Sequence, residues 1–223
     1  MYKENCIAYV GLPVNQINAC VDNICASFLA RGYITALYYS NRLMQLPLAV
    51  FGLVFATVSL PMMSKAYAQK DMATLKNSLG YSVRFTIFIS FPAATDLAVI
   101  GLPTVKLLFE RGKFNSLASL TTNNALFYYS LGLPAYALTR IFANAFYAFQ
   151  DTKTPAKMVM MTMILHVILY NLLMRLMDGG LAFATAAASC FNFILLAAYL
   201  KKRIGKLGLK QISFSYLKAL FAS

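Results

Sequence analysis

Arg42 is the residue whose chemistry is most constrained by its neighbours. It is the only charged side chain between Gly32 and Ser64. A guanidinium cannot be deprotonated, so at bilayer depth it must face water or protein rather than lipid. Its planar set of N–H donors suits phosphate oxygens, which it binds in pairs. The stretch therefore predicts an anion-binding group inside a membrane segment.

The residues around Arg42 bear on where its side chain points. The segment Tyr38–Asn41 comes directly before it and supplies polar partners. In an alternative interpretation Arg42 extends to the outer membrane interface, because it lies 11 residues from Arg31. We favour a cavity, since extension to the interface does not require polar neighbours.

A second polar stripe precedes this segment. Asn15, Asn18 and Asp22 are spaced three and four residues apart, so they share one helix face that cannot comfortably contact lipid. Asp22 is either an ion site or a structural hydrogen-bonding partner. We favour the structural role, because one carboxylate provides too few oxygens for a metal ion.

Three further polar side chains lie inside apolar segments. Asp96 and Arg140 could pair between helices, and a buried pair is more often a packing device than a binding site. His166, the only histidine, is either a hydrogen-bonded core residue or part of a proton relay. We favour the structural interpretation for all three.

The composition indicates that these residues lie in a membrane protein. The chain is 60% hydrophobic and 12% charged, and its mean hydropathy is +0.62, whereas soluble domains carry about 25% charged residues. Apolar segments long enough to cross a core of about 30 Å recur along it. We predict an all-α bundle of six spans, at 7–30, 34–66, 79–108, 121–149, 156–176 and 180–200.

The positive charges predict the orientation of the spans. The net charge is +13, which alone would suggest nucleic acid, but the basic residues lie between the spans. The positive-inside rule then places the N-terminus in the cytoplasm and makes nucleic acid unnecessary. The cytoplasmic set is Lys3, Lys65, Lys70, Lys76, Lys153, Lys157, Lys201, Lys202, Arg203, Lys206 and Lys210, and the outer set is Arg31, Arg111, Lys113 and Arg175.

Two predicted cytoplasmic connections have distinct chemistry. The segment 64–84 is either an amphipathic helix on the membrane surface or a polar linker. The second connection contains Asp151, Lys153 and Pro155, which is typical of a tight turn that ends one helix and starts the next. A gating role for that turn is possible, but a turn alone explains it.

Three sequence stretches resemble one known family. They are residues 11–68, from GLPVNQINAC to SKAYA, then FERGKF at 109–114 and FYAFQDTKTP at 146–155. In this order they resemble the MurJ (MviN) family of lipid II flippases. Each stretch alone is a weak signal, but together they make the match quite specific, and the resemblance extends across essentially the whole chain.

The resemblance implies a fold and a location. The family belongs to an exporter superfamily with two six-helix bundles around a central cavity, in the bacterial cytoplasmic membrane. Residues 1–203 would be the second bundle and 204–223 the start of a further membrane segment. The missing N-terminal bundle and membrane lipids would be the partners of this chain.

The resemblance also implies a function. Family members move lipid II, a polyprenyl-diphosphate-linked precursor, to the outer leaflet by alternating access. Arg42 falls on a cavity arginine of the family, whereas Gln45 stands where the family often has an acidic residue. The predicted substrate-binding residues are Arg42, Asn41, Tyr39, Gln45, Asn18 and Asp22, and those with a structural or gating role are Asp96, Arg140, Asp151, Lys153 and Pro155.

Other functions are less well supported. We expect no enzyme, because the sequence has neither paired carboxylates at useful spacing nor a nucleophile motif. No cofactor or metal site is expected, and a coupling cation is left open. The rivals are another exporter of the superfamily, carrying polysaccharide-linked lipids or drugs, and a half-bundle that transports nothing.

Overall fold

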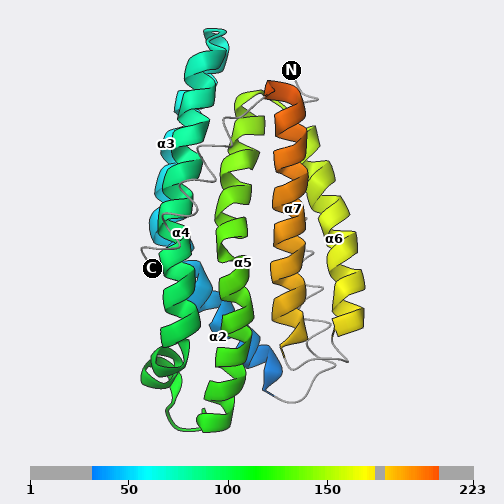
Figure 1. Ribbon diagram of the computed structural model, residues 1–223. Helices are drawn as coiled ribbons and strands as arrows, with labels where there is room; N and C mark the ends of the chain where they lie inside the picture. Colours follow the sequence, from blue (N-terminus) through cyan, green and yellow to red (C-terminus); the bar gives the residue numbers. More distant parts are fainter. Residues whose placement is uncertain (1–31, 174–178, 206–223) are drawn as a thin grey trace, which may run out of the picture.

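The computed structural model of the protein describes residues 32–173 and 179–205, without the side chains of 51–57. All of its regular elements in these ranges are helical, and their long axes run side by side (Figure 1). The predicted span 7–30, with Asn18 and Asp22, lies outside the described residues. The elements are α2 (Tyr33–Pro47), η1 (Leu48–Gly52), α3 (Leu53–Ala68), α4 (Met72–Phe109), α5 (Ser116–Ala148), α6 (Lys153–Leu173) and α7 (Gly180–Ile204).

The helices match the five predicted spans that fall in the described ranges. Three of them, α4, α6 and α7, are long and apolar enough to cross a membrane. The predicted span 34–66 corresponds to α2, η1 and α3 in succession. Pro47 ends α2, and a π-helical turn follows it, because proline lacks the N–H that would continue the α-helical ladder. As a result α2 runs obliquely behind α5, whereas α3 lies alongside α4 (Figure 1).

The connection between α3 and α4 differs from both predictions made for 64–84. It is a tight turn in which Lys70 has φ 57°, and Asp71 accepts from the backbone N–H groups of Ala73 and Thr74. A hydrogen bond from the Thr74 side chain lowers the Asp71 pKa most strongly, and the backbone hydrogen bonds lower it further. The prediction of a surface helix or polar linker is therefore wrong.

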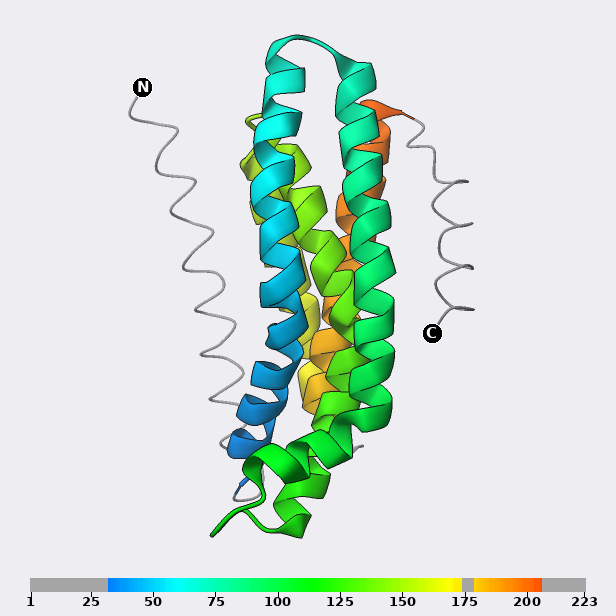
Figure 2. The same cartoon turned by 90° about the vertical axis from the view of Figure 1, so that its left-hand side faces the viewer.

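The helix α4 has 38 residues and is about 57 Å long. Together with α3 it projects beyond the other helices (Figure 2).

Two ends of the bundle can be told apart by charge. The end that carries the α3–α4 turn, the α5–α6 turn and the last turn of α7 is called the basic end here. Its basic residues are Lys65, Lys70, Lys76, Lys153, Lys201, Lys202 and Arg203. The opposite end carries the α4–α5 loop at 110–115.

The core is built around α5, which lies between α4 and α7 (Figure 1). Toward the basic end, Phe142 and Phe146 of α5 pack with α3, α4 and α7. Toward the opposite end, Tyr129 and Leu133 pack with α2 and α7. Small residues allow the closest helix approach, as expected from the Ala-rich α7. A Cβ on Gly132 would lie 2.8 Å from the Ala186 Cβ and 2.9 Å from its Cα.

Gly132→Ala should therefore destabilise the bundle by about 1–3 kcal/mol, because a methyl group would force α5 and α7 apart. The matched control is Gly80→Ala in α4, where the added Cβ meets nothing within 4 Å. Thermal unfolding of both variants in detergent measures the effect. Equal melting temperatures for the two variants would contradict the close contact.

Candidate functional site

One face of α2 is anchored in the bundle by a buried hydroxyl. Ser40, which is fully buried, donates to the Thr122 carbonyl of α5 at 2.7 Å, and its Oγ is also 2.6 Å from the Ala36 carbonyl. Leu37 and Met44 bury the rest of this face. The opposite face of α2 is consequently turned away from α5.

The exposed face carries the polar residues of the predicted site. Tyr38, Arg42 and Gln45 follow each other at intervals of four and three residues and are all exposed, so they form one stripe. Asn41, at its edge, accepts a hydrogen bond from the Gln45 amide. We call these four residues the α2 stripe.

Arg42 is held by Tyr38 one turn earlier. Its Nη2 donates to the Tyr38 hydroxyl oxygen at 3.2 Å, and its guanidinium carbon lies 5.1 Å from the centre of the Tyr38 ring. The ring therefore makes a cation–π contact and positions the charge. Among the described residues the guanidinium has no acidic partner, so its other N–H groups can donate hydrogen bonds to a bound anion.

The structure brings together only part of the predicted binding set. Arg42, Asn41 and Gln45 lie on the α2 stripe, but Tyr39 does not. Its ring centre is 4.4 Å from that of Phe109 and 5.7 Å from that of Phe114. Tyr38, expected as one of the polar neighbours of Arg42 but not included among the predicted binding residues, is the neighbour that contacts it, at the spacing of four residues that predicts such a contact.

The α4–α5 loop next to Tyr39 is held by its own acidic residue. The Glu110 carboxylate accepts hydrogen bonds from the Ser116 and Ser119 hydroxyls, each at 2.7 Å. These bonds, with Ser116 first, lower the Glu110 pKa. Phe109 and Phe114, which flank the loop, pack against Tyr39. The FERGKF stretch therefore shapes the loop.

Asp96 and Arg140 are not paired with each other. Both are exposed, on α4 and α5 respectively, and the ion pair found in the described residues joins other side chains. The prediction of a pair between them is wrong, because the two residues lie at different levels of the bundle. Leu97, beside Asp96, packs with Leu126 of α5, which is about 21 Å along that helix from Arg140. His166 is buried, and its Nε2 lies 3.1 Å from the Thr185 hydroxyl, as a hydrogen-bonded core residue would.

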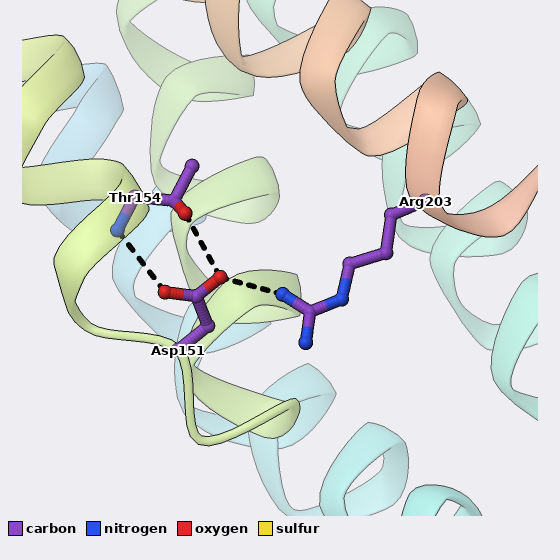
Figure 3. A network of polar contacts seen from close by, with 3 residues as sticks. All are labelled: Asp151, Thr154 and Arg203. Atoms are coloured by element: carbon purple, nitrogen blue, oxygen red, sulfur yellow. Dashed lines mark hydrogen bonds and ion pairs between the residues drawn. The ribbon is translucent and has the colours of Figure 1, made fainter.

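Asp151 occupies the turn between α5 and α6 and contacts residues of α6 and α7 (Figure 3). It caps α6 by accepting from the Thr154 N–H at 3.1 Å and from the Thr154 hydroxyl at 2.8 Å. Arg203 of α7 donates to the same carboxylate at 2.5 Å. The Arg203 guanidinium also lies 4.9 Å from the Phe149 ring centre, and Phe149 packs on Tyr67 of α3. We call this set the Asp151 network.

The Asp151 network determines the charge of its carboxylate. Partial burial alone would raise the Asp151 pKa, but hydrogen bonds from Thr154 and the contact with Arg203 outweigh it and lower the pKa. Lys153 is exposed, and Pro155 is buried in the first turn of α6. Of the three residues predicted here, Asp151 makes the contacts that connect elements.

The described residues contain no group of three His, Cys, Asp or Glu side chains that could hold a metal ion. The candidate site is the Arg42 guanidinium on the exposed face of α2.

Comparison with known proteins decides the family. A family model described as Lipid II flippase MurJ matches residues 1–223. The chain belongs to the MurJ family.

Individual relatives of the family extend well beyond this chain. A probable lipid II flippase MurJ of Vibrio cholerae is 35% identical over 191 residues, covering 85% of the chain and 36% of the relative. One of Rhizobium meliloti is 37% identical over 188 residues, covering 84% and 35%. The chain therefore spans little more than a third of the length of these curated relatives.

A solved structure supports the fold. The protein titled "Lipid II flippase MurJ, inward closed conformation" matches with a TM-score of 0.78 and 27% identity, over 93% of this chain and 45% of that one. The expected fold class, half of an all-α MurJ-type membrane protein, is confirmed. The chain is part of a multi-pass inner-membrane protein.

Asp151→Asn and Arg203→Gln should each lower the melting temperature modestly. Arg203 is 42% exposed, so the pair itself should contribute no more than about 1 kcal/mol. A double-mutant cycle with the combined variant measures the coupling. Additive effects would show that the contact between Asp151 and Arg203 contributes nothing.

The lowered Asp151 pKa predicts that the stability of the folded protein depends on pH. Asp titrates near pH 3.9 in unfolded chains, and its pKa in the folded protein is lower. The stabilisation by Asp151 is therefore complete above about pH 4 and is lost as the pH falls through the folded-state pKa. Asp151→Asn should weaken this acid dependence in unfolding measured between about pH 2 and 6, and an unchanged profile would contradict it.

Proposed function

We propose that the protein containing this chain moves lipid II from the cytoplasmic to the outer leaflet by alternating access. This chain would supply the second of two bundles. The observation that carries the proposal is the exposed Arg42, held by Tyr38, in a chain matched along its whole length by the MurJ family model. The names of the relatives support the choice of substrate.

The chemistry of the α2 stripe fits such a substrate. Lipid II carries a diphosphate with about two negative charges, and a guanidinium binds phosphate oxygens through charge-assisted hydrogen bonds. Its polyprenyl chain can remain in lipid, so only the head group needs a polar path. Gln45 and Asn41 are neutral, so the stripe presents one cation to an anionic head group. The exposed faces would then look toward the missing bundle.

The orientation and partners belong to the same proposal. The basic end would face the cytoplasm under the positive-inside rule, with the N-terminus of this chain on that side and the Arg42 region nearer the outside. Residues 1–203 would form the bundle and 204–223 would begin a further segment. We expect transport without catalysis, cofactor or nucleic acid, and a coupling cation stays a prediction.

In the full-length protein, Arg42→Gln should reduce lipid II transport about 10- to 100-fold. Hydrogen bonds to charged groups contribute about 1.5–3 kcal/mol, and about 1.4 kcal/mol corresponds to a factor of ten. Tyr38→Phe should cause a smaller loss, because the ring contact remains. Transport is measured in proteoliposomes with fluorescent lipid II, after folding is checked by size-exclusion chromatography.

Arg111→Gln is the matched control, because Arg111 is an exposed arginine whose Nη2 donates to the Leu107 carbonyl at the same end of the bundle. It should retain transport. A folded Arg42→Gln variant with full activity would exclude the role of Arg42. Transport of drug cations in place of lipid II would favour the rival exporter.

A further inference from the structure

Arg140 is a second permanent positive charge on an apolar helix, away from the helix ends. It is the only charged residue of α5, which is 33 residues long, and it lies eight residues from the end of that helix, or about 12 Å. α5 is the central helix of the bundle, yet Arg140 is exposed. The described residues provide it with no ion pair. A guanidinium at this depth must face a polar path or reach the interface.

The helical register shows which face of α5 carries Arg140. It follows Thr122 by 18 residues, which is five full turns at 3.6 residues per turn. Thr122 is the residue whose carbonyl accepts the Ser40 hydroxyl of α2. Leu133, seven residues before Arg140, is buried on the same face with Leu37 of α2. Arg140 therefore continues the face of α5 that α2 covers.

This face is open at Arg140, whose side chain is exposed. Beyond Pro47 and the π-helical turn, the chain continues as α3, which packs against both α4 and α5 without covering Arg140. Tyr147, seven residues after Arg140, is 44% exposed on the same face. The uncovered end of the face thus carries an arginine and a tyrosine, the same pair of residue types as Arg42 and Tyr38.

The two arginines stand at different depths on one side of the bundle. The contact between Ser40 and Thr122 sets the level of α2 on α5. Counting along α5, Arg140 lies about 25 Å closer to the basic end than Arg42. The hydrocarbon core is about 30 Å thick. The two arginines therefore lie near the two ends of a path across the hydrocarbon core.

We propose that Arg140 is a second contact for the diphosphate of the lipid-linked substrate, engaged at the basic end of the path. This inference rests on the proposed function. An anion entering from the basic end would meet Arg140 on α5 and Arg42 about 25 Å further along. Charge-assisted binding of phosphate oxygens is the same chemistry at both positions.

Cysteine labelling tests whether Arg140 faces this path. In the full-length protein with its native cysteines replaced, Arg140→Cys should react with a membrane-impermeant thiosulfonate added to the side of the basic end. Purified lipid II should slow the reaction at least about fivefold, and undecaprenol, which lacks phosphate, should not. A merely structural arginine would show no such protection.

Arg84→Cys is the matched control. Val83, beside Arg84, packs in the same cluster as Leu138 and Ile141 of α5, so Arg84 is exposed at about the same depth but on α4. Its labelling should not respond to lipid II. Equal protection at both positions, or no labelling at position 140, would overturn the inference and indicate an arginine that extends to lipid head groups.

Transport separates this inference from the proposed function. Arg140→Gln should lower lipid II transport at least about tenfold, whereas Arg84→Gln should not change it. If folded Arg140→Gln transports normally while Arg42→Gln is inactive, the proposed role of Arg140 is wrong and the proposed function is supported. If the unaltered protein moves no lipid II, the proposed function and the role of Arg140 are both wrong.

Discussion

The hydrogen bond from the Ser40 hydroxyl to the Thr122 carbonyl fixes how α2 sits on α5. Ser40 is fully buried and its side chain is small, so α2 can approach α5 closely at this point, and the contact favours one rotation of α2 over others. With Ser40 inside, Arg42 two residues later is directed outward. The orientation of the α2 stripe, and with it the availability of its charge, follows from this one contact.

The arrangement around α5 decides which faces remain open. α7 approaches α5 closely at Gly132, because Gly132 and Ala186 have small side chains. α2 covers one face only as far as Pro47, after which the π-helical turn leads into α3, which packs against both α4 and α5. Neither α3 nor α7 covers Arg140, which stays exposed. The polar faces therefore result from how the helices cross.

Both ends of the bundle are held by acidic residues that cap or close turns. At the basic end, Asp151 caps α6 and contacts Arg203 of α7. At the opposite end, Glu110 is held by two serine hydroxyls of α5. These two carboxylates belong to the stretches 146–155 and 109–114, which carry much of the resemblance to the MurJ family. These contacts show that both stretches stabilise the ends of helices.

The sequence by itself determined the class of protein, the described spans to within a few residues in most cases, and the special status of Arg42. Apolar length and the cost of a buried charge are local properties, so they can be read along the chain. The start of α4 at Met72 was missed, because a tight turn stabilised by Asp71 extends both helices beyond the apolar segments. Tertiary structure alone decided that Tyr39 packs on Phe109 and Phe114 and that Asp96 and Arg140 are apart. Such contacts depend on the rotation and crossing of whole helices, which the packing against α5 sets.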